Sequence, residues 1–121
     1  MTHPRLLECS FLIPLVRDSH LSDGQPHDPD LWEWLDDEVL WRFGGRTLDL
    51  GRFEGFYLDP DTGEKVFDVS RKYVVAVPED RLDELRALLS VASFSFAQKC
   101  IYLSIAGQVE FIEGPSHGQR E

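Results

Sequence analysis

Five side chains could form a polar site on one face of a sheet, because neighbouring residues of a strand point to opposite faces. If Ile101, Leu103 and Ile105 of the strand expected at 100–106 point toward a core, Cys100 and Tyr102 point away from it. The same alternation in LLECSFLIPLV (6–16) brings a glutamate to that face, and the strand at 65–78 adds an arginine and a tyrosine if its register matches. The candidate ligand-binding residues are Glu8, Arg71, Tyr73, Cys100 and Tyr102.

This set of groups suits the binding of a polar small molecule or acid–base chemistry. Two other uses of the same face remain open. It can be a solvated surface, or it can pack against a second copy of the chain in a homodimer.

A second group of residues that could bind a metal ion lies in the polar segment 18–29. Imidazole and carboxylate side chains together suit zinc, iron or manganese, and His20, Asp23 and His27 are the nearest approach to such a set. Their spacing matches no familiar metal motif, and a solvated loop that ends in the helix cap Asp28 explains the same residues. We therefore predict no metal and no cofactor.

The glycines of FGGRTLDLGRFEGFYLDPDTGE (43–64) favour turns and a kinked strand over a phosphate-binding loop. A phosphate loop follows a strand and precedes a helix, whereas Gly44 and Gly45 follow an expected helix and precede a strand. DPDTGE (59–64) lacks the further ligands of a calcium loop and is typical of a hairpin turn.

Charge is unevenly distributed along the chain, which has a net charge of -10. This excess of acids argues against nucleic-acid binding and against anionic membranes.

Residues 18–40 contain eight Asp or Glu and no Lys or Arg. Together with Trp34, Glu38 and Trp41, this segment suggests an acidic interface for a basic protein partner. A solvated helix with tryptophans at the edge of the core is the alternative.

The expected elements are strands at 6–16, 46–58, 65–78 and 100–106 and helices at 29–43 and 79–90, with a short added strand ending near residue 113. This order resembles the ferredoxin-like α+β superfold. The resemblance implies an antiparallel sheet with both helices on one face, and one domain over 1–121 with a core at 5–113 and a tail at 114–121. Many unrelated activities share this fold, so it implies no particular function.

Two cysteines do not make a disulfide framework, and the first strand is too short and interrupted to be a signal or membrane segment. We therefore expect a cytoplasmic protein. The absence of a catalytic motif favours a non-enzymatic protein-binding or regulatory module, and we expect a homodimer formed through its open sheet face. The alternative is a small enzyme or ligand-binding protein with its site on that face. A metal protein that uses His20 and His27 is the third possibility.

Overall fold

The strand β1 (Leu6–Pro14) lies in the middle of the sheet and shows the burial pattern that its sequence predicts. Cys9, Phe11 and Ile13 are fully buried, while Ser10 and Leu12 between them are partly exposed. The structure is a computed structural model that describes residues 4–115, apart from the side chain of Leu50. Most of the tail expected at 114–121 therefore lies outside the described residues.

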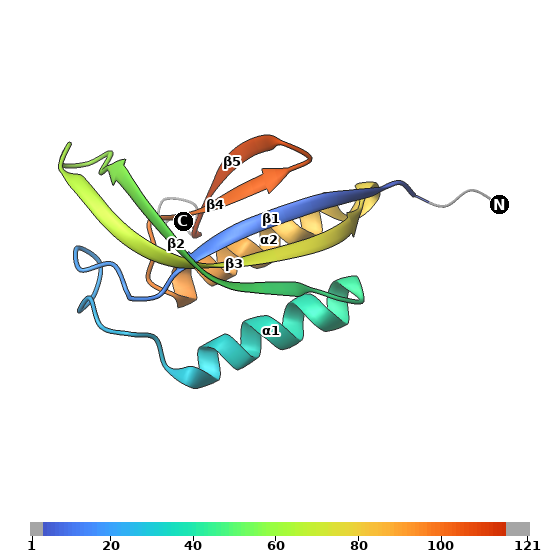
Figure 1. Cartoon of the computed structure of the whole chain (residues 1–121), viewed down its shortest axis with the longest axis horizontal. Coiled ribbons are helices and arrows are strands. Elements are labelled where there is room, and N and C mark those ends of the chain that lie inside the picture. Colours follow the sequence, from blue (N-terminus) through green and yellow to red (C-terminus); the bar gives the residue numbers. More distant parts are fainter. Residues whose placement is uncertain (1–3, 116–121) are drawn as a thin grey trace.

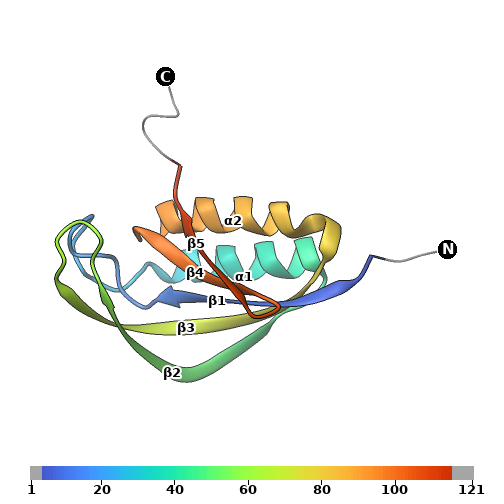
Figure 2. The ribbon, with the colours of Figure 1, turned by 90° about the horizontal axis from the view of Figure 1, so that it is seen from above.

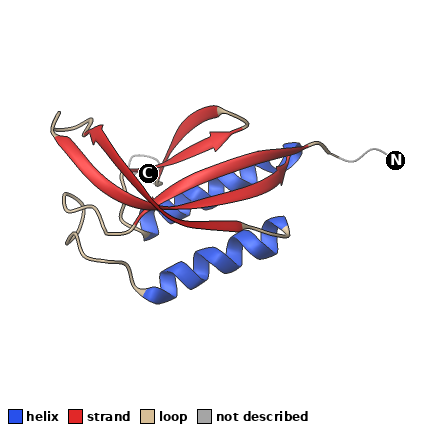
Figure 3. Ribbon diagram, in the orientation of Figure 1, coloured by secondary structure: helices blue, strands red, loops and turns tan. Residues whose placement is uncertain are grey.

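The described chain forms an α+β fold with one five-stranded antiparallel sheet and two long helices (Figure 3). The strands lie in the order β2-β3-β1-β4-β5. The other elements are α1 (Pro29–Phe43), β2 (Thr47–Leu58), β3 (Lys65–Pro78), a 3-10 turn (Glu79–Arg81), α2 (Leu82–Ser95), β4 (Cys100–Ile105) and β5 (Gln108–Glu113).

The ends of α1 are set by the residues that the sequence marks. Asp28 caps its start, with the carboxylate accepting a hydrogen bond of 2.9 Å from the backbone N–H of Asp30. Pro29 occupies the first turn, where its missing N–H costs nothing. At the other end Gly44 adopts φ 84°, a left-handed conformation that ends the helix and that glycine tolerates best. Both predicted caps are confirmed.

The second helix differs from the prediction at both ends. It begins only after a 3-10 turn, and it continues to Ser95 instead of ending at residue 90. The extension is stabilised by packing, because Ala92 and Ser93 are buried and the Ser93 hydroxyl donates to the carbonyl of Gln98 at 2.9 Å. The hydrogen bond spans only five residues, but the burial of Ala92 and Ser93 depends on their packing against the rest of the fold, which the pattern within 79–90 does not predict.

Both helices cover one face of the sheet and leave the other face open (Figures 1 and 2). Leu35 and Val39 of α1 and Leu85 and Leu89 of α2 meet the inward residues of the strands in a single core. None of the described helices is long and apolar enough to cross a lipid bilayer.

The outer hairpin of β2 and β3 is bent. Its register shifts between Asp49 and Phe53, so β2 carries a bulge in this segment, which contains Gly51. Such a bulge increases the local twist of the strand. Figures 1 and 2 show that the far part of this hairpin bends away from the flat part of the sheet.

Candidate functional site

The open face of the sheet carries three of the candidate side chains, as predicted. Cys100 and Tyr102 alternate with the buried residues of β4 and therefore point away from the helices. Glu8 lies on the same face, but it is opposite Ala76, whereas Tyr102 is opposite Leu12. Glu8 and Leu12 are four residues apart on β1, and two residues along a strand span about 6.7 Å. Glu8 therefore lies more than about 10 Å from the row of Tyr102. Glu8 does not converge with Cys100 and Tyr102.

The expected placement of Arg71 and Tyr73 on this face is wrong. Tyr73 is opposite Phe11 in the register of β1 and β3, and residues opposite each other share a face. The two rings stack 4.9 Å apart in the core, on the helix side of the sheet. The guanidinium of Arg71 lies 4.0 Å from the ring of Trp32 on α1, on the same side.

The phenol of Tyr73 is a structural group in this fold. Its hydroxyl donates to Asp36 of α1 at 2.5 Å, and burial, followed by this contact, raises the pKa of Tyr73 well above its usual value. Tyr73→Phe should destabilise the protein by about 1–2 kcal/mol, because the carboxylate of Asp36 loses its buried donor. Urea unfolding measures this loss. A variant of full stability that fails to bind ligand would place Tyr73 in the binding site instead.

A cluster that sequence reasoning missed lies where the bent hairpin approaches the start of β4. It contains Tyr57 of β2, Asp68 and Ser70 of β3, and Cys100 of β4. Asp68 and Ser70 alternate with the helix-facing residues of β3 and so belong to the open face. β1 ends at Pro14, opposite Ser70, so Asp68 has no partner on that strand.

Asp68 is a half-buried carboxylate with no cationic partner among the residues that the structure describes. Burial raises its pKa, and a hydrogen bond from Ser70 offsets part of this rise. Ser70 is only 5% exposed. Gly55 is opposite Asp68, and a Cβ added to this glycine would lie 3.7 Å from Asp68 Oδ1. An ionised Asp68 therefore lacks a counter-charge, which a cationic ligand would provide.

The surroundings of Tyr57 are negative. Burial raises the pKa of Tyr57, and the charges of Asp18, Asp68 and Asp59 raise it further. The pKa of the Cys100 thiol is also raised, first by burial and then by Glu113 and Asp68. Both groups therefore stay protonated near neutral pH, where Tyr57 can donate a hydrogen bond and Cys100 is a poor nucleophile.

Aromatic rings flank this acidic cluster. Phe53 is opposite Ser70, and Tyr102 makes an edge contact with Phe111 at 5.8 Å. A ring face attracts cations, so these residues favour the same kind of ligand as the carboxylate does. The geometry of the open face is therefore suited to a small cation with apolar parts.

A buried ion pair holds the hairpin in place over the sheet. Lys99 Nζ contacts Asp59 Oδ2 at 2.8 Å and Asp61 Oδ2 at 2.9 Å. Asp59 is 2% exposed and also accepts backbone hydrogen bonds from Asp61 and Thr62, so DPDTGE is a turn. The turn predicted at 59–64 is confirmed, and its ion pair fixes the strand ends that carry Tyr57 and Asp68.

This ion pair predicts a pH-dependent stability. The Lys99 ammonium and backbone donors lower the pKa of Asp59 from 3.8 to about 2. A lowered pKa contributes stability that is complete above about pH 4 and lost as the pH falls toward about 2. The midpoint of thermal unfolding should be lower in Asp59→Asn than in the wild type at pH 6, and this difference should shrink between pH 4 and 2. The exposed Asp80→Asn serves as the control, and a difference that is constant with pH would contradict the prediction.

A surface groove lies at the other end of the sheet. It has a volume of about 530 Å³ and is lined by Glu8, Arg46, Thr47 and the backbone of Gly44 and Gly45. It is shallow and wide open. Glu8 belongs to this groove and not to the cluster around Asp68.

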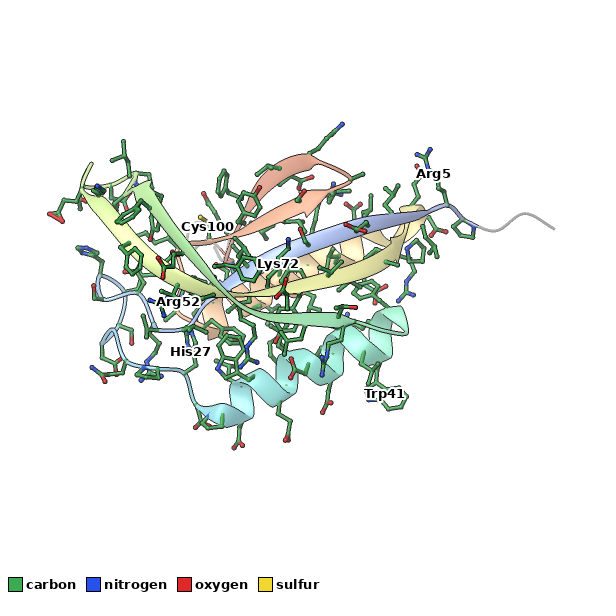
Figure 4. The ribbon with its side chains drawn as sticks, in the orientation of Figure 1. Arg5, His27, Trp41, Arg52, Lys72 and Cys100 are labelled. Atoms are coloured by element: carbon green, nitrogen blue, oxygen red, sulfur yellow. The ribbon has the colours of Figure 1, made fainter. Side chains whose placement is uncertain are left out.

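The two tryptophans of the acidic segment on α1 differ in their exposure to solvent. Trp41 is 81% exposed and points away from the sheet (Figure 4), whereas Trp34 is partly buried and packs against the core. Glu38 accepts a hydrogen bond of 2.9 Å from Arg42 one turn along. Trp34 is thus at the edge of the core, and a protein interface at these three residues stays a prediction.

The candidate metal ligands do not come together. The carboxylate of Asp23 binds the guanidinium of Arg17 at 2.7 Å, and the buried ring of His27 contacts the carbonyl of Pro14 at 2.7 Å through Nε2. His20 is exposed. Within residues 4–115, no group of three or more His, Cys, Asp or Glu side chains has the arrangement of a metal site.

Comparison with known proteins identifies two solved structures with a similar fold. No protein-family model and no curated protein matches the sequence. Two solved structures share the fold over nearly the whole chain. A phage SAM lyase in complex with S-methyl-5'-thioadenosine matches with a TM-score of 0.66 and 16% identity, covering 94% of each chain. A phage SAM lyase in the apo state matches with a TM-score of 0.64 and 16% identity, covering 92% of this chain and 91% of that one.

These matches correct the functional expectation drawn from the sequence. A non-enzymatic protein-binding or regulatory module was expected, and both matched structures are of an enzyme. The comparison contradicts this expectation, and it also contradicts the expectation that the protein is not an enzyme. The alternative, a small enzyme or small-molecule-binding protein with its site on the open sheet face, is better supported. At 16% identity the likeness itself shows a shared fold.

Proposed function

We propose that this protein is a small enzyme that binds S-adenosylmethionine (SAM) on the open face of its sheet and releases S-methyl-5'-thioadenosine from it. The observation that carries the proposal is Asp68, a half-buried carboxylate without a cationic partner among the described residues, close to Tyr57, whose pKa the charges of Asp18, Asp68 and Asp59 raise. SAM carries a sulfonium cation next to apolar groups. The likeness to a phage SAM lyase supports the same choice of substrate.

The chemistry of a sulfonium fits these groups. When the bond between sulfur and the amino-acid arm breaks, its electron pair stays on sulfur and leaves a neutral thioether. The arm then gains an electron pair from its own carboxylate, or from a C–H bond whose proton passes to a base. The sulfonium charge disappears in this step, so attraction to Asp68 assists binding and not bond breaking.

Asp68 can also contribute to the rate. Burial raises its pKa, which makes it a stronger base than an ordinary aspartate. Tyr57 stays protonated and can donate a hydrogen bond to the substrate. Since the thiol of Cys100 is protonated too, we assign it a packing role and no covalent step.

The test is incubation of the purified protein with SAM and chromatographic detection of S-methyl-5'-thioadenosine. The expected result is its release in proportion to protein concentration, above the slow spontaneous breakdown of SAM. Release no faster than in a heat-denatured sample would refute the proposal.

We further propose that the domain belongs among the ferredoxin-like sandwiches. The sheet order β2-β3-β1-β4 and the position of both helices on one face support this (Figure 2). The single domain over 1–121, the cytoplasmic location and the homodimer stay predictions.

A further inference from the structure

The open face carries one more charged group, a half-buried lysine without an ion pair among the described residues. Lys72 lies on β3, between Leu12 on β1 and Asp49 on β2. It is half-buried, and Figure 4 shows it over the middle of the sheet. No ion pair of Lys72 occurs among the described residues.

The neighbouring acid does not neutralise this lysine. Asp49 is directly opposite Lys72, but its Oδ1 accepts a hydrogen bond of 2.9 Å from the backbone N–H of Gly51 in the bulge. The bulge therefore turns this carboxylate toward its own strand. Lys72 instead directs its ammonium toward the ring of Phe53, 5.5 Å from the ring centroid.

The direction of the Lys72 side chain is informative. Phe53 is opposite Ser70, so an ammonium near Phe53 leans along β3 toward Asp68. Asp68, Ser70 and Lys72 follow each other on one face at intervals of about 6.7 Å. The face thus presents an anion, a hydroxyl and a cation in a row, with Tyr57 and Phe53 beside them on β2.

We propose that Lys72 binds the carboxylate of the amino-acid arm while Asp68 holds the sulfonium, and that this spacing selects sulfonium compounds that carry a carboxylate. The inference rests on the proposed function, which it makes more specific. In SAM, three carbons separate the sulfonium sulfur from the carboxylate carbon. Both charges thus lie on one short arm, and Asp68 and Lys72 are two strand intervals of about 6.7 Å apart on the same face.

The α-ammonium of the same arm has a partner in this arrangement. Asp49 has its second carboxylate oxygen free of hydrogen bonds among the described residues, and it is next to Lys72. A lysine and an aspartate side by side can bind the carboxylate and the ammonium of an α-amino acid respectively. Lys72 is thus a specificity-determining residue with no role in bond breaking.

The experiment compares two unreactive compounds by calorimetry. S-adenosylhomocysteine carries the amino-acid arm, whereas S-methyl-5'-thioadenosine lacks it. Lys72→Met should weaken binding of S-adenosylhomocysteine by roughly 10- to 100-fold and leave that of S-methyl-5'-thioadenosine unchanged. Lys72→Arg should restore part of the loss. Lys65→Met is the matched control, because Lys65 is on the same strand but contacts the exposed ring of Phe56.

Each outcome is decisive. An equal loss for both compounds, no loss for either, or a wild type that binds neither compound would overturn the assignment of Lys72. The proposed reaction fails separately, if the wild type releases no S-methyl-5'-thioadenosine from SAM. A protein that discriminates between the two compounds through Lys72 but does not cleave SAM would keep this inference and lose the reaction.

Discussion

Asp68→Asn should lower kcat/KM for the release of S-methyl-5'-thioadenosine from SAM by about 10²- to 10⁴-fold. The amide has nearly the shape of the carboxylate, but it neither attracts the sulfonium nor accepts a proton. KM should rise because the charge attraction is lost, and kcat should fall because the base is lost. Steady-state kinetics of product release over a range of SAM concentrations separate the two effects.

Stability gives this prediction a second readout. Burial raises the folded-state pKa of Asp68 above its ordinary value, so the ionised carboxylate destabilises the fold and protonation relieves this as the pH falls. Asp68→Asn removes the buried charge, so the variant should be at least as stable as the wild type at pH 7. Lost activity with retained stability marks a functional site.

The control is Asp37→Asn, at an exposed position on α1, which covers the opposite face of the sheet. It should leave kcat/KM unchanged. If Asp68→Asn cleaves SAM at the wild-type rate, the carboxylate has no part in the reaction and the site must be sought elsewhere, first in the groove at Glu8.

Local signals in the sequence were enough for the elements and their ends. Asp28, Pro29 and Gly44 act within one helical turn, so their effect on α1 can be predicted from neighbouring residues. The alternation in β4 likewise predicted the outward direction of Cys100 and Tyr102 correctly. These predictions need no knowledge of which strand lies beside which.

The candidate site could not be predicted from such local signals, because it depends on which strands lie side by side and how the hairpin bends. The face of Tyr73 follows from its pairing with Phe11, 62 positions away, and periodicity along one strand leaves that choice open. Asp68 and Tyr57 become a cluster because a bulge bends the hairpin and Lys99 binds Asp59 at its turn. A signal was available in β3: once Tyr73 is assigned to the core, alternation brings Asp68, Ser70 and Lys72 to the open face.

Phe11→Ala should destabilise the protein by about 3–5 kcal/mol, a large part of the 5–15 kcal/mol typical of a domain. Phe11 is fully buried on the middle strand and stacks on Tyr73 with an angle of 8° between the rings. Its loss leaves a cavity under both helices and removes the ring that holds Tyr73 against Asp36. Urea unfolding at pH 7 measures the change in the free energy of unfolding.

Phe94→Ala is the matched control, since it deletes the same side chain from a position on α2 that is 71% exposed. It should change the free energy of unfolding by no more than about 0.5 kcal/mol. If Phe11→Ala does not fold, Phe11→Leu keeps most of the volume and should show a smaller loss of the same sign. Equal effects at positions 11 and 94 would mean that β1 is not the centre of the core. The open face would then lack the rigid support on which the spacing of Asp68 and Lys72 depends.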